Sequence, residues 1–83
     1  MLDVTERAAA VARQSDEAAR RFNPDARIRL VRAGSGLAFE FTDAADPTDT
    51  ELDCLGTILL VQVGIEGTVD VGDHNTPMLL PPS

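Results

Sequence analysis

Cys54 carries the only thiol of the chain, and a thiol acts as a nucleophile or as a soft metal ligand once it is deprotonated. Its neighbours in sequence are Asp53 and Leu55. A carboxylate beside a thiol raises the pKa of that thiol, and no histidine stands next to Cys54 to act as a base. We therefore interpret Cys54 as a structural thiol. If its side chain is exposed, it can still supply one metal ligand from each subunit of an oligomer.

His74 is the only imidazole of the chain, and Asp70 lies four residues before it. These two side chains could meet at a metal ion, but a tetrahedral zinc site takes three or four protein ligands. The glycine-containing stretch 72–75 is instead typical of a turn. We expect no metal site and no cofactor. The alternative is an atypical iron or iron–sulfur carrier that uses Cys54 and His74 across an oligomer interface.

The other reactive residue types predict no catalytic site. The acids between Asp43 and Asp53 lack the ligand spacing and the central glycine of a calcium-binding EF-hand loop. Ser35 has no base close to it in sequence and is not part of a G-x-S-x-G nucleophile elbow. We therefore predict that the protein is not an enzyme. A third alternative is a small enzyme subunit in which Ser35, His74 and an acid converge in one cleft.

The composition argues against several classes of partner. The 83 residues include fourteen acids, seven arginines and no lysine, for a net charge of −7. Nucleic acids and anionic membranes are bound by clustered cations, so we expect neither as a partner. A single cysteine forms no internal disulfide, and the first residues show no apolar leader, so we predict a cytoplasmic protein. The length fits one domain, 1–83, with an aliphatic core because only three residues are aromatic.

A short strand at 2–4 and an amphipathic helix are expected at the N-terminus. Thr5 is a candidate N-cap with Glu6 in the first turn, and a capping box of Asp3 and Glu6 is the alternative. The helix extends to Phe22, and Pro24 stops it. The face predicted to be buried consists of Ala8, Val11, Ala12, Ser15, Ala19 and Phe22. The solvated side consists largely of Arg7, Arg13, Asp16, Glu17 and Arg20.

A β-hairpin follows the helix. Apolar residues alternate at 27–32 and 37–42, and the loop between them is Ala33-Gly34-Ser35-Gly36. Glycine adopts a positive φ without steric cost, which favours a tight hairpin turn at this point. Residues 43–53 are expected to form an exposed acidic loop.

The remaining segments predict three more strands. The most apolar run, 57–63, is expected to be covered on both faces. Shorter strands are predicted at 68–71 and 78–80, and a proline-rich tail from about residue 76. The element order predicts an α+β fold: one N-terminal amphipathic helix packed on a mostly antiparallel sheet or small barrel-like sandwich.

Four of these segments occur in the order of a known family. They are the strand and Ala-rich helix of 2–12, the turn 33–37 before an aromatic strand, Gly56 before the apolar run, and Gly67-Thr68-Val69-Asp70. In this order they resemble the HesB-like proteins, the A-type iron–sulfur carriers, whose turn has the sequence Gly-Cys-Ser-Gly-Leu. The resemblance implies a HesB-like fold and protein partners among the iron–sulfur assembly components.

The sequence departs from the family at its ligands. In the family, the cysteine of the turn and a C-terminal Cys-x-Cys pair bind iron or the cluster. Gly34 stands at the turn position, and this sequence contains no Cys-x-Cys pair. Iron–sulfur clusters are held by thiolates, so the family's cargo does not transfer. The expectation is a non-catalytic, cysteine-depleted HesB-like accessory or interaction protein, with a homodimer as one form of interaction.

Overall fold

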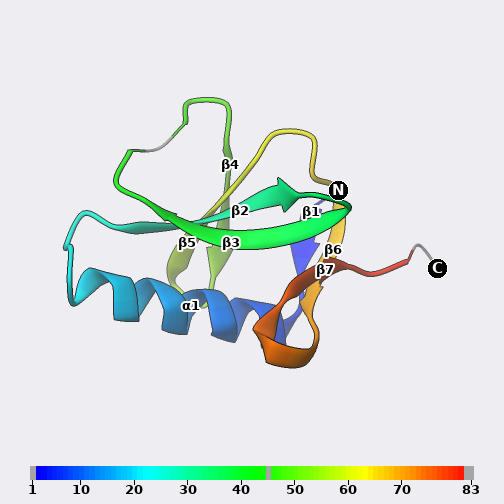
Figure 1. The fold of residues 1–83 in the computed structure, drawn as a ribbon, viewed down its shortest axis with the longest axis horizontal. Helices are drawn as coiled ribbons and strands as arrows, with labels where there is room; N and C mark the ends of the chain where they lie inside the picture. The colour runs from blue at the N-terminus through cyan, green and yellow to red at the C-terminus, as the bar shows by residue number, and fades with distance from the viewer. Residues whose placement is uncertain (1, 45, 82–83) are drawn as a thin grey trace.

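The computed structural model describes residues 2–44 and 46–81. These residues form one helix, one short 3₁₀ turn and seven strands (Figure 1). The expected α+β class with an N-terminal helix is confirmed. In chain order the elements are β1 (Leu2–Val4), α1 (Glu6–Arg20), β2 (Arg27–Ala33), β3 (Gly36–Thr42), β4 (Thr50–Cys54), β5 (Thr57–Val61), β6 (Gly67–Val71), η1 (Asp73–Asn75) and β7 (Pro77–Leu79).

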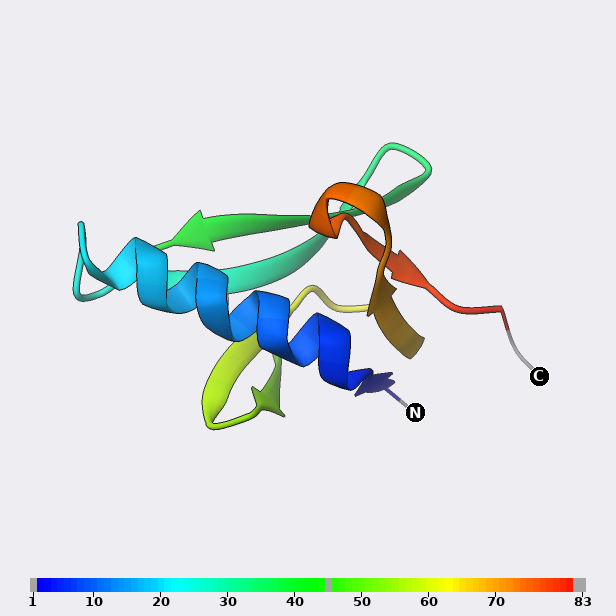
Figure 2. The same ribbon diagram turned by 90° about the horizontal axis from the view of Figure 1, so that it is seen from below.

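The strands form two sheets. The larger has the order β3-β2-β5-β4, and the smaller has the order β1-β6-β7. Three neighbouring pairs are antiparallel, β2/β3, β4/β5 and β6/β7, whereas β1/β6 and β2/β5 are parallel. The two parallel pairs join strands far apart in sequence, and local patterns do not reveal such pairing. The helix lies across the larger sheet (Figure 2) and contacts β2, β4, β5 and β6.

Helix α1 begins as predicted. The Thr5 hydroxyl accepts a hydrogen bond from the backbone N–H of Ala8 at 3.2 Å, which satisfies one of the free donors of the first turn. The Asp3 carboxylate instead accepts from the N–H of Val4, so the alternative capping box is not formed. The buried helix residues are Ala8, Ala9, Ala12 and Asp16.

Two residues of the helix segment were wrongly assigned from the sequence. Asp16 was expected on the solvated side, but it is 3% exposed and pairs with Arg20, Oδ2 to Nε at 3.0 Å. Phe22 was expected in the buried stripe, but it lies beyond the end of the helix and is 92% exposed. The reason is that the buried stripe runs through positions 9, 12 and 16, not through 15, 19 and 22.

The core is aliphatic, as the composition predicts. Its largest fully buried side chains come from β2, β4, β5 and β6, and alanines of α1 close it from the other side. Leu59 and Leu60 point to opposite faces of β5 and are both buried, so the strand is covered on both faces at its centre. The prediction that the whole run 57–63 is covered was wrong at its ends, because β5 ends at Val61 and Ile58 and Val63 are exposed. The largest members of the core are Ile28, Leu30, Cys54, Leu59, Val61 and Val69.

The predicted hairpin is formed by β2 and β3. Ala33 pairs with Gly36, so Gly34 and Ser35 are the two central residues of the turn. Gly34 has φ +59°, and Ser35 is not among the residues with positive φ, which is the pattern of a type II′ turn. A second tight turn joins β4 to β5 through Leu55 and Gly56, both with positive φ.

Two expected irregular segments contain strands. Residues 43–53 were expected to be a loop, but β4 begins at Thr50, because Leu52 and Cys54 alternate with exposed acids and point toward the core. The prediction of a proline-rich tail from about residue 76 was also wrong at its start, because Pro77 is buried and begins β7. The tail residues Pro82 and Ser83 lie outside the described part of the chain. Within that part, no helix has the length and apolar character needed to cross a membrane.

Candidate binding groove

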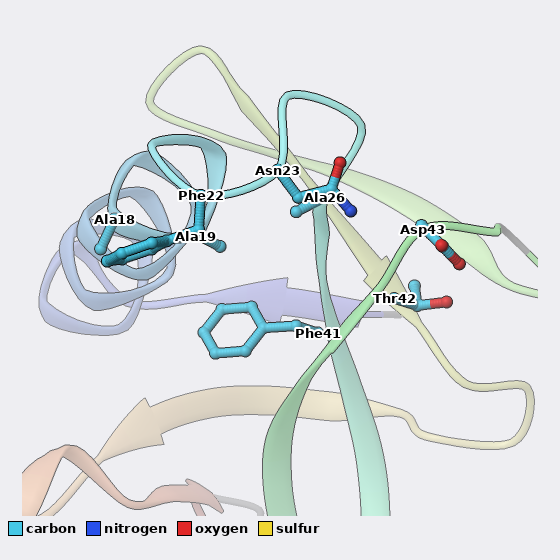
Figure 3. Close-up of a pocket in the computed structure, with 8 residues that line it drawn as sticks. All are labelled: Ala18, Ala19, Phe22, Asn23, Ala26, Phe41, Thr42 and Asp43. Carbon is cyan, nitrogen blue, oxygen red and sulfur yellow. The ribbon is translucent and has the colours of Figure 1, made fainter.

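An apolar groove opens between the end of α1 and the end of β3. Two phenylalanines stand on either side of it, Phe22 after the helix and Phe41 on the strand (Figure 3). The groove has a volume of about 630 Å³. Its lining residues are Ala18, Ala19, Phe22, Asn23, Ala26, Phe41, Thr42 and Asp43.

The position of Phe22 follows from how the helix ends. Arg21 is the C-cap, and the backbone N–H of Phe22 bonds to the carbonyl of Ala19 at 3.1 Å. Asn23 donates to the same carbonyl at 3.0 Å, and Pro24 then prevents another helical turn. Phe22 therefore lies just beyond the last turn of the helix, where it is almost completely exposed.

The position of Phe41 follows from the length of the hairpin. Leu37, Phe39 and Phe41 share one face of β3, and their burial decreases in that order from buried to exposed. Phe41 lies opposite Ile28 in the register and is 59% exposed. The small side chains of Ala18 and Ala19 leave the space beside its ring unfilled (Figure 3).

Cys54 belongs to the core. Its side chain is fully buried at the end of β4. Burial, with a smaller contribution from the Asp53 carboxylate, raises the pKa of the thiol to about 11. This thiol was expected to serve as a metal ligand only if its side chain were exposed. In this structure the side chain is buried.

His74 lies in the 3₁₀ turn between β6 and β7. It is exposed and has φ +59°, as expected of a turn residue. Its sequence neighbour Asp70 is engaged elsewhere: the Thr5 hydroxyl donates to Asp70 Oδ1 at 2.7 Å. That hydrogen bond lowers the pKa of Asp70, and a hydrogen bond from the Val71 N–H lowers it further by a smaller amount. Within 2–44 and 46–81, no three His, Cys, Asp or Glu side chains gather in a way that could hold a metal ion.

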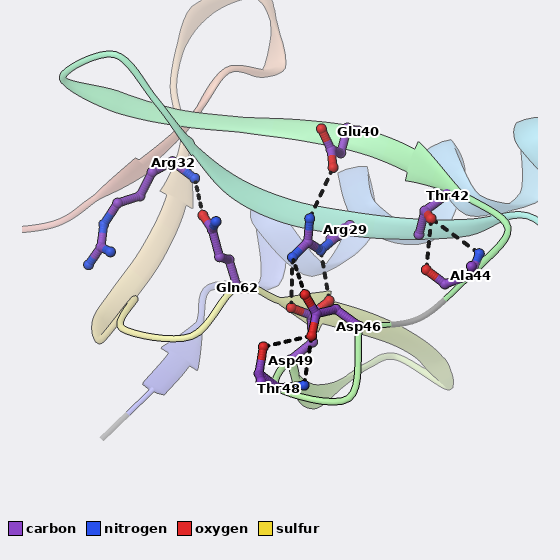
Figure 4. Close-up of polar contacts among 9 residues, drawn as sticks. All are labelled: Arg29, Arg32, Glu40, Thr42, Ala44, Asp46, Thr48, Asp49 and Gln62. Carbon is purple, nitrogen blue, oxygen red and sulfur yellow. Dashed lines mark hydrogen bonds and ion pairs between the residues drawn. The ribbon is translucent and has the colours of Figure 1, made fainter.

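The acidic segment after β3 is organised by Arg29. This residue lies on the face of β2 away from the helix and pairs with Asp49, Nε to Oδ2 at 2.7 Å and Nη2 to Oδ1 at 2.9 Å (Figure 4). Arg29 Nη1 lies 3.2 Å from Glu40 Oε1, and Nη2, which also donates to Asp49, lies 3.8 Å from Asp46 Oδ2. The hydrogen bonds to Asp49 raise the pKa of the guanidinium, and the hydrogen bond to Glu40 raises it further by a smaller amount.

The carboxylates of this segment therefore hold the loop on the sheet. Asp46 also accepts from the backbone N–H of Thr48 at 2.9 Å and from its hydroxyl at 2.7 Å. These two bonds, with a smaller effect of Arg29, lower the pKa of Asp46. Asp46 and Asp49 thus act as structural partners of Arg29, and the sequence alone gave no sign of that role.

The turn Ala33-Gly34-Ser35-Gly36 is exposed and lies beside β7. With Pro77, Met78 and Leu79 it lines a second hollow of about 440 Å³. The turn offers one hydroxyl and no thiol, imidazole or carboxylate, so it lacks the ligand types that hold an iron–sulfur cluster.

No protein-family model and no curated protein matches this chain. The case for function therefore depends on the groove. Sequence reasoning missed it because Phe22 and Phe41 are nineteen positions apart, and only the fold brings them together. One sequence signal was available: Phe22 comes directly before Asn23 and Pro24, where a helix ends and loses its packed face.

Proposed function

We propose that the protein is a non-catalytic binding domain and that the groove between Phe22 and Phe41 is where it contacts a partner protein. The proposal includes the HesB-like relationship and places the partners among the components of iron–sulfur assembly. The observation that carries it is the exposure of these two rings, 92% and 59%.

Exposure of both rings is costly in so small a chain. Burying one phenylalanine side chain contributes about 1.5–3 kcal/mol to stability, and the chain has only three such residues. Two of them stay on the surface while alanines fill the space under the helix. Aromatic side chains gathered around a hollow are typical of protein-binding surfaces, where they become the residues that contribute most to affinity.

The HesB-like part of the proposal is supported by the order of the elements. A helix after a short strand, a hairpin with a glycine turn, an acidic segment and a Gly-Thr strand follow one another as the resemblance implies. In the structure Gly34 is a central residue of the hairpin turn, which is the turn that the resemblance matches to the family's cysteine-containing turn. A chain of this fold with its turn ligand missing is better suited to binding proteins than to carrying a cluster.

A capture experiment tests the binding role. The tagged wild-type protein is compared with the double variant Phe22→Ser/Phe41→Ser and with Val63→Ser, in an extract of the source cells. Val63 is a matched control because it is an exposed apolar residue, 61%, that does not line the groove. We expect proteins of iron–sulfur assembly to be retained by the wild type and by Val63→Ser and lost from the double variant. Equal retention by all three refutes the proposal.

Anaerobic reconstitution with iron and sulfide separates this role from that of an atypical carrier. We expect the wild type to remain colourless. Charge-transfer absorbance that is lost in Cys54→Ser or His74→Ala would support the carrier instead. Circular dichroism of each variant shows whether the fold is retained.

A further inference from the structure

The second hollow, between the β2/β3 hairpin turn and strand β7, is separate from the groove. Its volume of about 440 Å³ falls within the range of roughly 300–1,000 Å³ that is typical of small-molecule sites. Among the described residues that line it, only Arg32 is charged, although the chain as a whole has a net charge of −7. The charge of this hollow therefore favours an anion as its ligand.

Arg32 lies on a face of β2 that is otherwise apolar. Ile28 and Leu30 on this face are fully buried, and Leu37 lies opposite Arg32 in the register. Arg32 itself is exposed, and its Nη2 donates to the Gly64 carbonyl at 2.6 Å. Within 2–44 and 46–81 it forms no ion pair with a carboxylate. The positive charge of Arg32 is therefore free to pair with a bound anion.

The hairpin turn adds hydrogen-bond donors beside this charge. Gly34 and Ser35 both line the hollow, and as the two central residues of the turn they have N–H groups outside the β2/β3 ladder. Neither N–H donates to a backbone carbonyl of the described residues, and Ser35 is exposed with its hydroxyl. Proteins bind anions with such N–H and hydroxyl donors together with a guanidinium. The turn thus contributes donors to an anion site.

We propose that the second hollow binds a carboxylate carried on an apolar body, as in an aliphatic acid or the C-terminal residue of a peptide. An arginine pairs with both oxygens of a carboxylate. One arginine matches the single charge of that group, whereas a phosphate monoester carries about −1.5 to −2 charges. The apolar walls supply the contacts for the body of the ligand, since Met78 and Leu79 line the hollow and are 42% and 43% exposed.

Titrations followed by two-dimensional ¹H–¹⁵N NMR test the site at about pH 7, where carboxylic acids are ionised. The probes are hexanoate and N-acetyl-leucine, with hexanamide as an uncharged match and inorganic phosphate as an anion without an apolar body. We expect the carboxylates to shift the amide signals of Gly34, Ser35 and Met78 and to saturate at a dissociation constant of about 1 mM. Hexanamide and phosphate should bind at least about 10-fold more weakly. The tighter carboxylate shows whether the ligand is an aliphatic acid or a peptide C-terminus.

Two arginines of β2 provide a matched comparison. Arg32→Gln removes the charge from the hollow and should weaken hexanoate binding at least about 10-fold. Arg27→Gln should bind like the wild type, because Arg27 also donates to a carbonyl, that of Ala26, but does not line the hollow. Ser35→Ala removes one donor at an exposed position and should weaken binding about 3-fold. Circular dichroism checks the fold of each variant, and Ser35→Ala decides the outcome if Arg32→Gln does not fold.

Three results overturn the inference. They are the absence of a saturable shift with either carboxylate, equal binding of hexanamide and hexanoate, and unchanged binding in a folded Arg32→Gln. The groove variant Phe22→Ser/Phe41→Ser should bind hexanoate like the wild type, since neither ring lines the second hollow. A loss of binding in that variant would place the probe in the groove and would also refute the site.

Discussion

Chemical modification of Cys54 tests how firmly the core holds its thiol. The structure buries this side chain completely and raises the pKa of the thiol from an ordinary 9.0 to about 11. At about pH 8, a shift of this size reduces the reactive thiolate roughly 100-fold. Burial adds a second barrier, because a reagent reaches the sulfur only when the core opens.

The assay is the rate at which an aromatic disulfide reagent modifies Cys54 at about pH 8, in buffer and in concentrated urea. We expect the native rate to be at least about 100-fold slower than the rate in urea. A native rate within about 10-fold of the urea rate would contradict the placement of Cys54 in the core and would make it available as a metal ligand.

Substitution of the same residue separates packing from polarity. Cys54→Ala should lower the free energy of unfolding by about 1 kcal/mol, because it leaves a small cavity. Cys54→Ser should lower it by about 1–3 kcal/mol, since it places a hydroxyl among apolar side chains. Urea denaturation measures both values, and a serine variant as stable as the wild type would show that the site is polar or open.

Three further predictions concern backbone strain and acid stability. Leu55 has φ +56° in the turn before Gly56, a conformation that asparagine adopts more readily than leucine. Leu55→Asn should therefore raise the free energy of unfolding by about 1 kcal/mol. An unchanged free energy in urea denaturation would argue against that turn. Gly34→Ala should lower the free energy of unfolding by about 1 kcal/mol. The cause is the backbone φ of +59°, since a Cβ at this position would meet open space. An unchanged urea midpoint would contradict the turn type. The lowered pKa of Asp70 means that its stabilising contribution is present above the ordinary value of 3.8 and is lost as the pH falls through the folded value. Acid titrations followed by circular dichroism should show a shallower loss of stability in Asp70→Asn than in the wild type, and equal slopes would rule out the Thr5 bond as the cause.

Local chemistry made part of the fold predictable. Thr5 marks the start of the helix because its hydroxyl can cap the first turn, and Gly34 marks the hairpin because it tolerates a positive φ. Strand β4 could also have been recognised, since Leu52 and Cys54 alternate with Glu51 and Asp53, but the acids favoured an exposed loop.

The rest depends on contacts between distant parts of the chain. The parallel pairing of β2 with β5 joins Leu30 to Val61, and no local pattern encodes it. Arg29 gathers Asp46 and Asp49 only once the chain after β3 folds back over the sheet. The groove arises in the same way, where the end of α1 comes to lie beside the end of β3.

The most direct test of the binding role is the affinity of a purified captured partner for three forms of the protein. The wild type and Val63→Ser should bind it equally, and Phe22→Ser/Phe41→Ser should bind it at least about 30-fold more weakly, as expected when two central aromatic contacts are removed. An affinity unchanged in the double variant would contradict the account, because the partner would then bind elsewhere than the groove between Phe22 and Phe41.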